Sequence, residues 1–289
     1  MNVDYNSSSA IKNILEQNAF SMQKKFGQNF LVNENARKKL VKALDIENVK
    51  SIWEIGPGLG AITKLLLEGN ACVTVFEIDK GFIKLLQEIF SSEIKSGKLK
   101  IVAGDVLKTW KSEIEKTGNI PERLFGNLPY NIAASIIADT IEKDVRFEKI
   151  VVTVQKEVGR RMCAKEGTKD YSSFSILCQW AYNVKNYLDL GPANFWPRPH
   201  VESSSLIMTK KDDFPSCQNK NLFMKMQRSL FMARRKNIKN NLSVFLNSDK
   251  IAEEALKKSG IDLNIRAETL PLKKLLELSD IINTDIIKA

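Results

Sequence analysis

Short apolar runs alternate with helical patterns over the first two thirds of the chain, and this alternation constrains the fold most strongly. Apolar spacing typical of helices separates several of the runs, at residues 61–67, 82–90 and 173–182. The runs that predict strands cover residues 51–55, 71–77, 99–103, 124–125, 149–154, 186–190 and 204–209. Because strands joined through helices pair in parallel, the sequence predicts an α/β fold with a mostly parallel, seven-stranded sheet.

Both ends of the chain differ from this alternating region. Residues 1–20 begin with a polar stretch and continue into a short helical pattern, so we expect a partly disordered N-terminal extension. Residues 21–211 are expected to form the main domain, in which Asn33 caps a helix that runs to about Leu44. The remaining residues, 212–289, are expected to form a small helical domain, with a polar linker followed by helices over 222–231, 243–245, 251–256 and 270–282.

The composition narrows the classes of function. The net charge of +10 and the pI near 9.3 favour a polyanionic partner. His200 is the only histidine, which disfavours a histidine metal site or a catalytic triad, and we expect no metal. The four cysteines show no Cys-x-x-Cys spacing and are expected to be reduced. No apolar run approaches the roughly 20 residues of a membrane span, and we expect a cytoplasmic protein.

A glycine-rich turn follows the first predicted strand and opens a helix. Its sequence, Glu54 to Gly60, contains Gly-x-Gly-x-Gly rather than the Gly-x-Gly-x-x-Gly of dinucleotide enzymes, and Pro57 removes one amide that a phosphate would use. These differences favour a nucleoside ligand without a pyrophosphate. Glu77 ends the second strand, where a carboxylate holds ribose hydroxyls, and Asp105 ends the third, where it is placed to accept from an adenine amino group.

A second turn, Asn127-Leu128-Pro129-Tyr130, follows the fourth strand and precedes a helical pattern. The carboxyl ends of parallel strands are where open α/β sheets bind ligands. Asn127 offers one acceptor and two donors, and Tyr130 offers a flat aromatic face, so the turn is suited to a planar group that carries an amine. A capped helix entry with an aromatic lid is the alternative for this turn alone.

The ordered set of glycine turn, two acids and Asn-Leu-Pro-Tyr, each after its own strand, resembles a class I S-adenosylmethionine-dependent methyltransferase. More closely, residues 22–289 resemble the ribosomal RNA adenine N6,N6-dimethyltransferases that act on the small subunit. The segments that carry this resemblance, besides the two turns, are Lys25–Leu31, Phe195–Ser203, Arg234–Lys236, Asn240–Leu242 and Arg266–Glu268.

The resemblance implies a set of site residues. Those expected to bind the cofactor S-adenosyl-L-methionine are Gln28, Asn29, Leu31, Gly56, Gly58, Glu77, Ile78, Asp105, Val106 and Asn127. Those expected at the reacting base are Asn127, Leu128, Pro129, Tyr130 and Phe195. We expect Asn127 and the Leu128 carbonyl to accept the adenine N6 hydrogens, while Tyr130 and Phe195 stack on the base. For Phe195, a core aromatic at a domain edge is an equal alternative.

A basic run lies in the C-terminal region. Residues 220–248 contain several Lys and Arg residues and no acidic residue. A charge run is usually a solvated face, but a polyanionic substrate favours contacts to phosphates. The candidate RNA-binding residues are Lys24, Lys25, Lys225, Arg228, Arg234, Arg235, Lys236 and Lys239.

From this resemblance, the expected activity is transfer of methyl groups to N6 of two adjacent adenosines near the 3′ end of small-subunit (16S) ribosomal RNA. It also implies a role in ribosome biogenesis, as an assembly factor for the small subunit, and we expect a monomer. One alternative is the related large-subunit ribosomal RNA adenine N6-methyltransferase of the antibiotic-resistance type. A second is a binding factor with dispensable methylation, and a nicotinamide dehydrogenase is a third, disfavoured by the glycine spacing.

Overall fold

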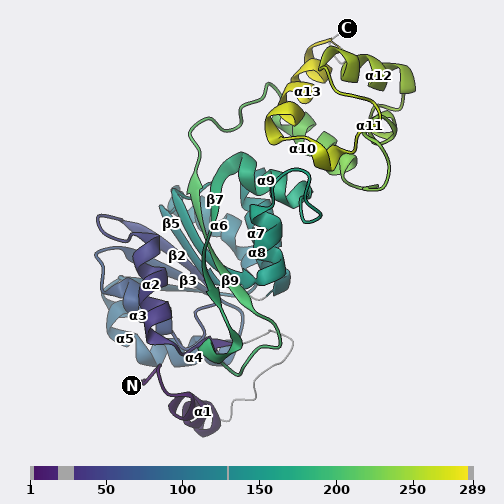
Figure 1. Ribbon diagram of the computed structural model, residues 1–289. Helices are drawn as coiled ribbons and strands as arrows, with labels where there is room; N and C mark the ends of the chain where they lie inside the picture. Colours follow the sequence, from purple (N-terminus) through teal and green to yellow (C-terminus); the bar gives the residue numbers. More distant parts are fainter. Residues whose placement is uncertain (1–2, 19–28, 129, 286–289) are drawn as a thin grey trace. The chain divides into compact units, whose positions relative to one another are not determined.

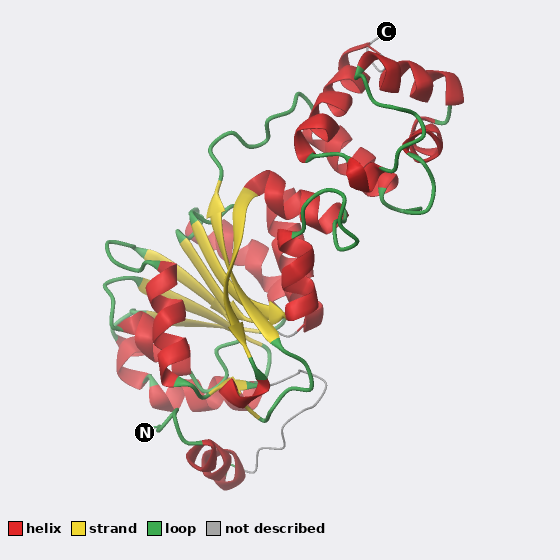
Figure 2. Ribbon diagram, in the orientation of Figure 1, coloured by secondary structure: helices red, strands yellow, loops and turns green. Residues whose placement is uncertain are grey.

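The computed structural model describes residues 3–18, 29–128 and 130–285 and contains a seven-stranded sheet (Figures 1 and 2). The strand order is β4-β3-β2-β5-β6-β9-β7; the first five strands run parallel, and β9 pairs antiparallel with β6. The bounds are β2 Ser51–Ile55, β3 Cys72–Glu77, β4 Leu99–Ala103, β5 Arg123–Asn127, β6 Lys149–Gln155, β7 Tyr182–Leu190 and β9 Ser203–Lys210. The predicted α/β class and mostly parallel seven-stranded sheet are confirmed.

The strand order reverses between β2 and β5, which is where this fold creates a binding crevice. From β2 the chain continues to β3 and β4 on one side, and it then crosses back to add β5 and β6 on the other. Ile55, the last residue of β2, is level with Gly126 of β5. Because helices leave neighbouring strands in opposite directions at such a point, the loops after β2 and β5 separate and leave a crevice.

Helices cover both faces of the sheet (Figure 2). The cluster of buried residues around Ile52, Val73 and Val75 includes Leu40 of α2 and Leu66 of α3. Elsewhere, the Trp110 indole nitrogen of α6 donates to Asp139 of α7 at 2.9 Å. The bounds of these helices and their neighbours are α2 Glu34–Leu44, α3 Ala61–Leu67, α4 Lys80–Ile89, α5 Ser91–Lys95, α6 Val106–Thr117, α7 Tyr130–Glu142, α8 Lys156–Cys163 and α9 Ser173–Ala181.

Some helices and strands agree with those predicted from the sequence, and others were not predicted. Asn33 caps α2 as expected, because its side chain accepts from the Ala36 amide at 2.9 Å. Helices α5, α6 and α8 were not expected, since their apolar spacing is short or interrupted by charges. A two-stranded sheet pairs β1 (Phe30–Leu31) with β8 (Phe195–Trp196), and two-residue strands leave no periodic signal in a sequence.

The N-terminal residues are more ordered than their polarity suggests. Helix α1 spans Ser8–Gln17, and Ser7 caps it by accepting from the Ala10 amide at 3.1 Å. Val3 and Tyr5 are buried, although the polar composition of residues 1–9 is typical of a disordered stretch. They pack in an apolar cluster that includes residues distant in sequence, and this tertiary burial is invisible in a local pattern.

Internal contacts divide the chain into two compact units, Met1–Gly159 with Lys185–Lys210, and Arg160–Val184 with Lys211–Ala289. The second unit contains α10 Lys220–Leu230, α11 Ile238–Leu246, α12 Asp249–Lys258 and α13 Leu272–Asp285. This division assigns residues 160–184 to the C-terminal helices, which differs from the boundary expected at residue 211. The domain limits expected from the sequence therefore stay a prediction.

Gly60 is a position where an added methyl group should destabilise the first unit strongly. Its φ is +87°, and a Cβ there would lie 2.3 Å from a ring carbon of Phe90. We expect Gly60→Ala to lower the free energy of unfolding by about 2–5 kcal/mol, from left-handed strain plus overpacking. Denaturant unfolding measures this loss. Gly118→Ala is the control, because φ is +67° but nothing lies within 4 Å, and equal losses would contradict the packing argument.

Candidate active site

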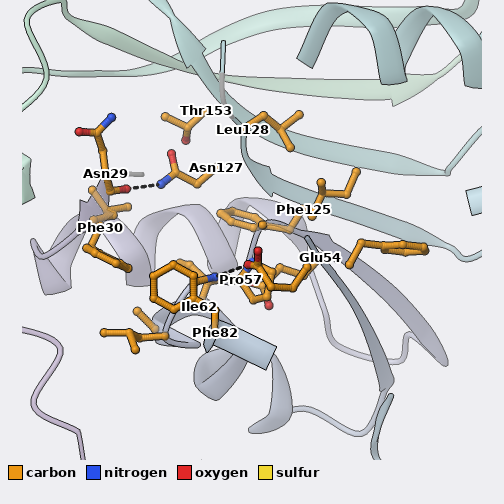
Figure 3. A pocket seen from close by; sticks show the side chains of 18 of the residues that line it. Asn29, Phe30, Glu54, Pro57, Ile62, Phe82, Phe125, Asn127, Leu128 and Thr153 are labelled. Carbon is orange, nitrogen blue, oxygen red and sulfur yellow. Dashed lines mark hydrogen bonds between the residues drawn. The ribbon is translucent and has the colours of Figure 1, made fainter. Parts of the chain in front are cut away.

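A cavity of about 400 Å³ lies at the carboxyl ends of β2, β3, β4 and β5 (Figure 3). Most of its wall comes from the turns that follow these four strands, and one side comes from β1 and its flanking residues. The wall includes Tyr5, Asn29, Phe30, Leu31, Glu54, Gly56, Pro57, Gly58, Glu77, Ile78, Asp105, Val106, Phe125, Asn127, Leu128, Thr153 and Phe195. The structure thus brings together most of the cofactor-binding residues expected from the sequence.

The glycine turn brings its backbone close to the neighbouring walls. Gly58 has a φ of +56°, and a Cβ on it would lie 3.1 Å from the Phe30 ring. A Cβ on Gly56 would lie 3.8 Å from the backbone oxygen of Asn127. Glycine is therefore required at Gly58 by its backbone conformation, and the turn lies directly beside the residue that ends β5.

Glu77 ends β3 with its carboxylate held by backbone amides. It accepts from the amides of Ile78 and Asp79, both at 2.9 Å, and from that of Gly58 at 3.3 Å. The carboxyl group is buried, and this burial raises its pKa to about 7 in spite of the amide bonds, which act in the opposite direction. Glu77 therefore links the glycine turn to the end of β3, and its charge changes near neutral pH.

A second buried acid, Glu54, lies within β2 and lines the same cavity. The Thr63 hydroxyl donates to it at 2.6 Å. Burial is the main cause that raises the pKa of Glu54 to about 8, and the nearby Glu77 raises it further. Glu54 was absent from the expected site residues, although an acid inside an otherwise apolar strand was a signal in the sequence.

Asp105 follows β4 and serves two purposes in its position. Its side chain accepts from the Leu107 amide at 3.0 Å and so caps α6. Asp105 and Val106 also line the cavity, as does Ile78 after β3. Capping of α6 is therefore compatible with a position of Asp105 in the cavity wall.

The Asn127 side chain has a defined orientation at the end of β5. Its Nδ2 donates to the backbone oxygen of Asn29 at 3.1 Å, shown as a dashed line in Figure 3. Since only the amide nitrogen can donate to a carbonyl, the side-chain oxygen is the group left to accept. The amide of the buried residue Leu128 donates to the Thr153 oxygen at 3.1 Å, which fixes the turn to β6.

Other residues of this turn are less fully described. Pro129 lies outside the described residues, and Tyr130 is described only as the first residue of α7. Gly126 precedes the turn, and a Cβ on it would lie 2.7 Å from the Leu128 side chain. Glycine is needed at this position because the Leu128 side chain folds back over it.

Phe195 lines the cavity but is also part of the core. It pairs with Leu31 where β8 meets β1, and it is only 3% exposed. The same buried cluster contains Leu31 and Phe125. The burial matches the alternative of a core aromatic, while Phe195 is also part of the cavity wall.

The neighbouring residues of the same two strands are also in contact. Phe30 stacks on Trp196 with ring centroids 6.2 Å apart.

Two of the basic candidates are paired with acids. Arg234 donates to Glu268 through two nitrogens, at 3.0 and 2.6 Å, and to the Lys169 oxygen at 2.7 Å. Lys239 pairs with Glu253. Arg235, Lys236, Lys225 and Arg228 are exposed. A run without acids in sequence therefore contains cations neutralised by acids from other segments. Lys24, Lys25 and Gln28 lie outside the described residues.

The described residues contain no group of three or more His, Cys, Asp or Glu side chains arranged to hold a metal ion. None of the helices in the described part of the chain is long and apolar enough to cross a membrane.

The family model described as "Ribosomal RNA adenine dimethylase" matches residues 19–284. A Treponema denticola protein named "Ribosomal RNA small subunit methyltransferase A" is 44% identical over 282 residues, 96% of each chain. A Borreliella burgdorferi protein of the same name is 38% identical over 283 residues, 98% of this chain and 96% of the other.

Two solved structures share the fold. A dimethyladenosine transferase from Plasmodium falciparum has a TM-score of 0.73 and 22% identity, over 87% of this chain and 96% of the other. The 23S ribosomal RNA methyltransferase ErmE has a TM-score of 0.64 and 20% identity, over 88% and 99%. Given the extent of the family match and these identities, the chain belongs to the ribosomal RNA adenine dimethylase family.

Proposed function

We propose that the protein transfers methyl groups from S-adenosylmethionine to N6 of two adjacent adenosines near the 3′ end of small-subunit (16S) ribosomal RNA, giving N6,N6-dimethyladenosines. The observation that carries this proposal is the oriented Asn127 amide, whose nitrogen is held by Asn29 while its oxygen is left as an acceptor in the cavity wall. The family membership and the names of the relatives support the choice of base and of ribosomal subunit.

The charges of the cavity wall fit S-adenosylmethionine. Glu54, Glu77 and Asp105 line it, and none of the described residues that line it is Lys, Arg or His. A wall with acids and no cation suits a ligand with a sulfonium and an ammonium group, and it is unsuited to a pyrophosphate. This charge pattern disfavours the dehydrogenase alternative. When bound, the cofactor supplies an electrophilic methyl group.

The residues that would hold the cofactor follow the order of the strands. Glu77, at the end of β3, would accept from ribose hydroxyls, and Asp105, after β4, would accept from the adenine amino group. Ile78 and Val106 would supply apolar contacts beside these acids, and the lack of a side chain at Gly56 and Gly58 would let the ligand approach the backbone closely. Asn29 and Leu31 complete the wall, and Gln28 is proposed from the family resemblance.

The chain promotes transfer by positioning the amine rather than by a strong base. An adenine N6 is a poor nucleophile because its lone pair is delocalised into the ring. The Asn127 side-chain oxygen and the Leu128 carbonyl are proposed to accept hydrogen bonds from the two N6–H groups. These bonds would stabilise the positive charge that develops on the nitrogen. The target base must leave its stack to reach these acceptors, and we propose Tyr130 and Phe195 as its aromatic walls, with Pro129 shaping the turn.

RNA binding is assigned to the C-terminal helices. Lys225, Arg228, Arg235 and Lys236 are exposed and suited to phosphates. Arg234 and Lys239 bind acids of the same unit, so we assign them mainly to its stability, and Lys24 and Lys25 stay candidates from the sequence. The proposal includes a monomer that acts in the cytoplasm as an assembly factor for the small subunit. The large-subunit enzyme remains the second candidate, supported only by the shared fold.

Mapping of methylated adenosines tests the proposed function. After incubation of the protein with unmethylated small subunits and S-adenosylmethionine, mass spectrometry of nuclease fragments should show dimethylation of two adjacent adenosines near the 3′ end of the 16S RNA. Methylation of large-subunit RNA only would favour the second candidate.

Asn127→Ala should nearly abolish transfer. Loss of one preorganised group at a developing charge lowers kcat by about 100-fold to 1000-fold. Single-turnover methylation and calorimetric cofactor binding measure the two effects, and we expect the cofactor affinity to fall by less than about tenfold, since Asn127 would contribute few of the cofactor contacts. Asn119→Ala, an exposed asparagine outside the cavity, is the control. Activity within a few-fold of wild type would contradict the proposed role of Asn127.

Cofactor binding should depend on pH through Glu77. A ribose hydroxyl would donate to the ionised carboxylate of Glu77, and the pKa of this carboxyl group is about 7. Because binding favours the deprotonated form, affinity should increase as pH rises, by about tenfold between pH 6 and pH 8. Calorimetry with S-adenosylhomocysteine measures this dependence. Glu77→Gln should bind weakly and lose the part of the pH dependence centred near pH 7, leaving that of Glu54, whose pKa is about 8, whereas Asp105→Asn should keep both parts. A pH-independent wild type would exclude Glu77 as the titrating contact.

The exposed cations should account for the salt dependence of RNA binding. Replacing Lys225, Arg235 and Lys236 by Gln should weaken binding and lower the slope of log K against log salt by up to about 3. Filter binding at several salt concentrations measures the slope. A matched variant that removes the exposed Lys12, Lys95 and Lys116 of the first unit is the control. Equal slopes for the two variants would assign RNA binding elsewhere.

A further inference from the structure

Part of the cavity wall comes from residues that precede the match to the family model, which begins at residue 19. Residues 3–18, called here the N-terminal segment, contribute Tyr5 and Ile11 to the wall. Val3 and Leu15 belong to the same apolar cluster, which also contains Leu59 of the glycine turn and Phe82 and Leu85 of α4. The segment is thus packed on the glycine turn rather than extended into solvent.

The Tyr5 hydroxyl joins this segment to the glycine turn. It donates to the backbone oxygen of Leu59 at 3.0 Å, across a separation of 54 residues. Tyr5 is buried, and burial raises the pKa of its hydroxyl above the ordinary range, so the group stays a neutral donor. Leu59 lies between Gly58 and Gly60, so the bond restrains the part of the turn that follows Gly58.

Arg37 joins the same segment to β1. Its guanidinium donates to the backbone oxygens of Tyr5, at 3.2 Å, and Leu31, at 2.6 Å, and also to the Asn6 side chain. Arg37 is 4% exposed and lies on the buried face of α2, where Leu40 and Leu44 are apolar. A buried guanidinium has a large desolvation cost, so its presence there indicates a specific positioning role.

The position of Tyr5 indicates which end of the cofactor it faces. Asp105 follows β4, while Glu77 and Asn127 end β3 and β5. This arrangement would place the adenine, the ribose and the reacting methyl along the sheet edge in the order β4-β3-β2-β5. The amino-acid end then remains for the glycine turn after β2 and for β1. Those are the two elements that Tyr5 and Arg37 connect.

We propose that the N-terminal segment is a wall of the cofactor site at the amino-acid end, and that Tyr5 and Arg37 are positioning residues that hold this wall against the glycine turn and β1. This inference rests on the proposed cofactor. It assigns to residues 3–18 a part in cofactor affinity that residues 29–210 alone do not supply.

Two variants and two ligands test the proposal. S-adenosylhomocysteine carries the amino-acid end, whereas 5′-methylthioadenosine has the adenosine and the sulfur but lacks that end. Full-length Tyr5→Phe should bind S-adenosylhomocysteine about 3-fold to 10-fold more weakly, the effect of one lost hydrogen bond, and Arg37→Met should lose more. Affinity for 5′-methylthioadenosine should stay within about 2-fold, because the adenosine contacts are unchanged. In methylation assays, KM for the cofactor should rise while kcat is preserved.

Arg123→Met is a matched control for Arg37→Met. Arg123 donates to the backbone oxygens of Leu44, at 3.0 Å, and Asp45, at 3.2 Å, beyond the other end of α2 and outside the cavity wall. Its loss should lower the melting temperature without changing the preference between the two ligands. Tyr187→Phe is the control for Tyr5→Phe, since this exposed hydroxyl donates to the Lys39 oxygen.

The outcomes separate this inference from the proposed function. Equal weakening of both ligands, or no weakening of either, in Tyr5→Phe and Arg37→Met would overturn the positioning role and leave a purely structural segment. Failure of the wild-type protein to bind S-adenosylhomocysteine would overturn the proposed cofactor itself. If Arg37→Met does not fold, Tyr5→Phe decides alone, because it removes one oxygen atom and keeps the packed ring.

Discussion

The parallel pairing of β2 with β5 is the constraint on which the rest of the site depends. Ile55 is level with Gly126 in this pairing, so the glycine turn and the Asn127 turn leave the sheet side by side. A Cβ on Gly56 would be 3.8 Å from the backbone oxygen of Asn127, which shows how close the two turns are. The methyl donor proposed for one turn would then be within reach of the amine proposed for the other. A different strand order would separate the same motifs by the width of at least one strand, about 4.8 Å.

The distribution of charge in the protein follows from the two partners it is proposed to hold. The chain has a net charge of +10, yet the described wall of the cavity contains three acids and no cation. A basic exterior attracts RNA over long range, whereas a buried acidic wall selects a cationic cofactor over nucleotides. The buried acids are costly to ionise without a ligand, as the raised pKa of Glu54 and that of Glu77 show. A cationic ligand would stabilise the ionised forms, so binding and deprotonation favour each other.

The sheet and the order of the four motifs could be predicted because they rest on local patterns. Each strand is a short apolar run, and each motif follows such a run directly. Three features could not be predicted because they depend on tertiary contacts. Tyr5 lies in a polar stretch, Phe195 joins the core through a two-residue strand, and Arg234 is neutralised by Glu268, which is 34 residues away. Glu54 was visible in the sequence, but its carboxyl contacts Thr63 only once α3 packs on β2.

Residues 29–31 connect these separate parts of the site. The Asn29 oxygen accepts from the Asn127 amide, the Leu31 oxygen accepts from Arg37, and Leu31 pairs with Phe195. One extended backbone segment therefore contacts the proposed catalytic amide, the aromatic wall and the guanidinium that also binds the Tyr5 oxygen.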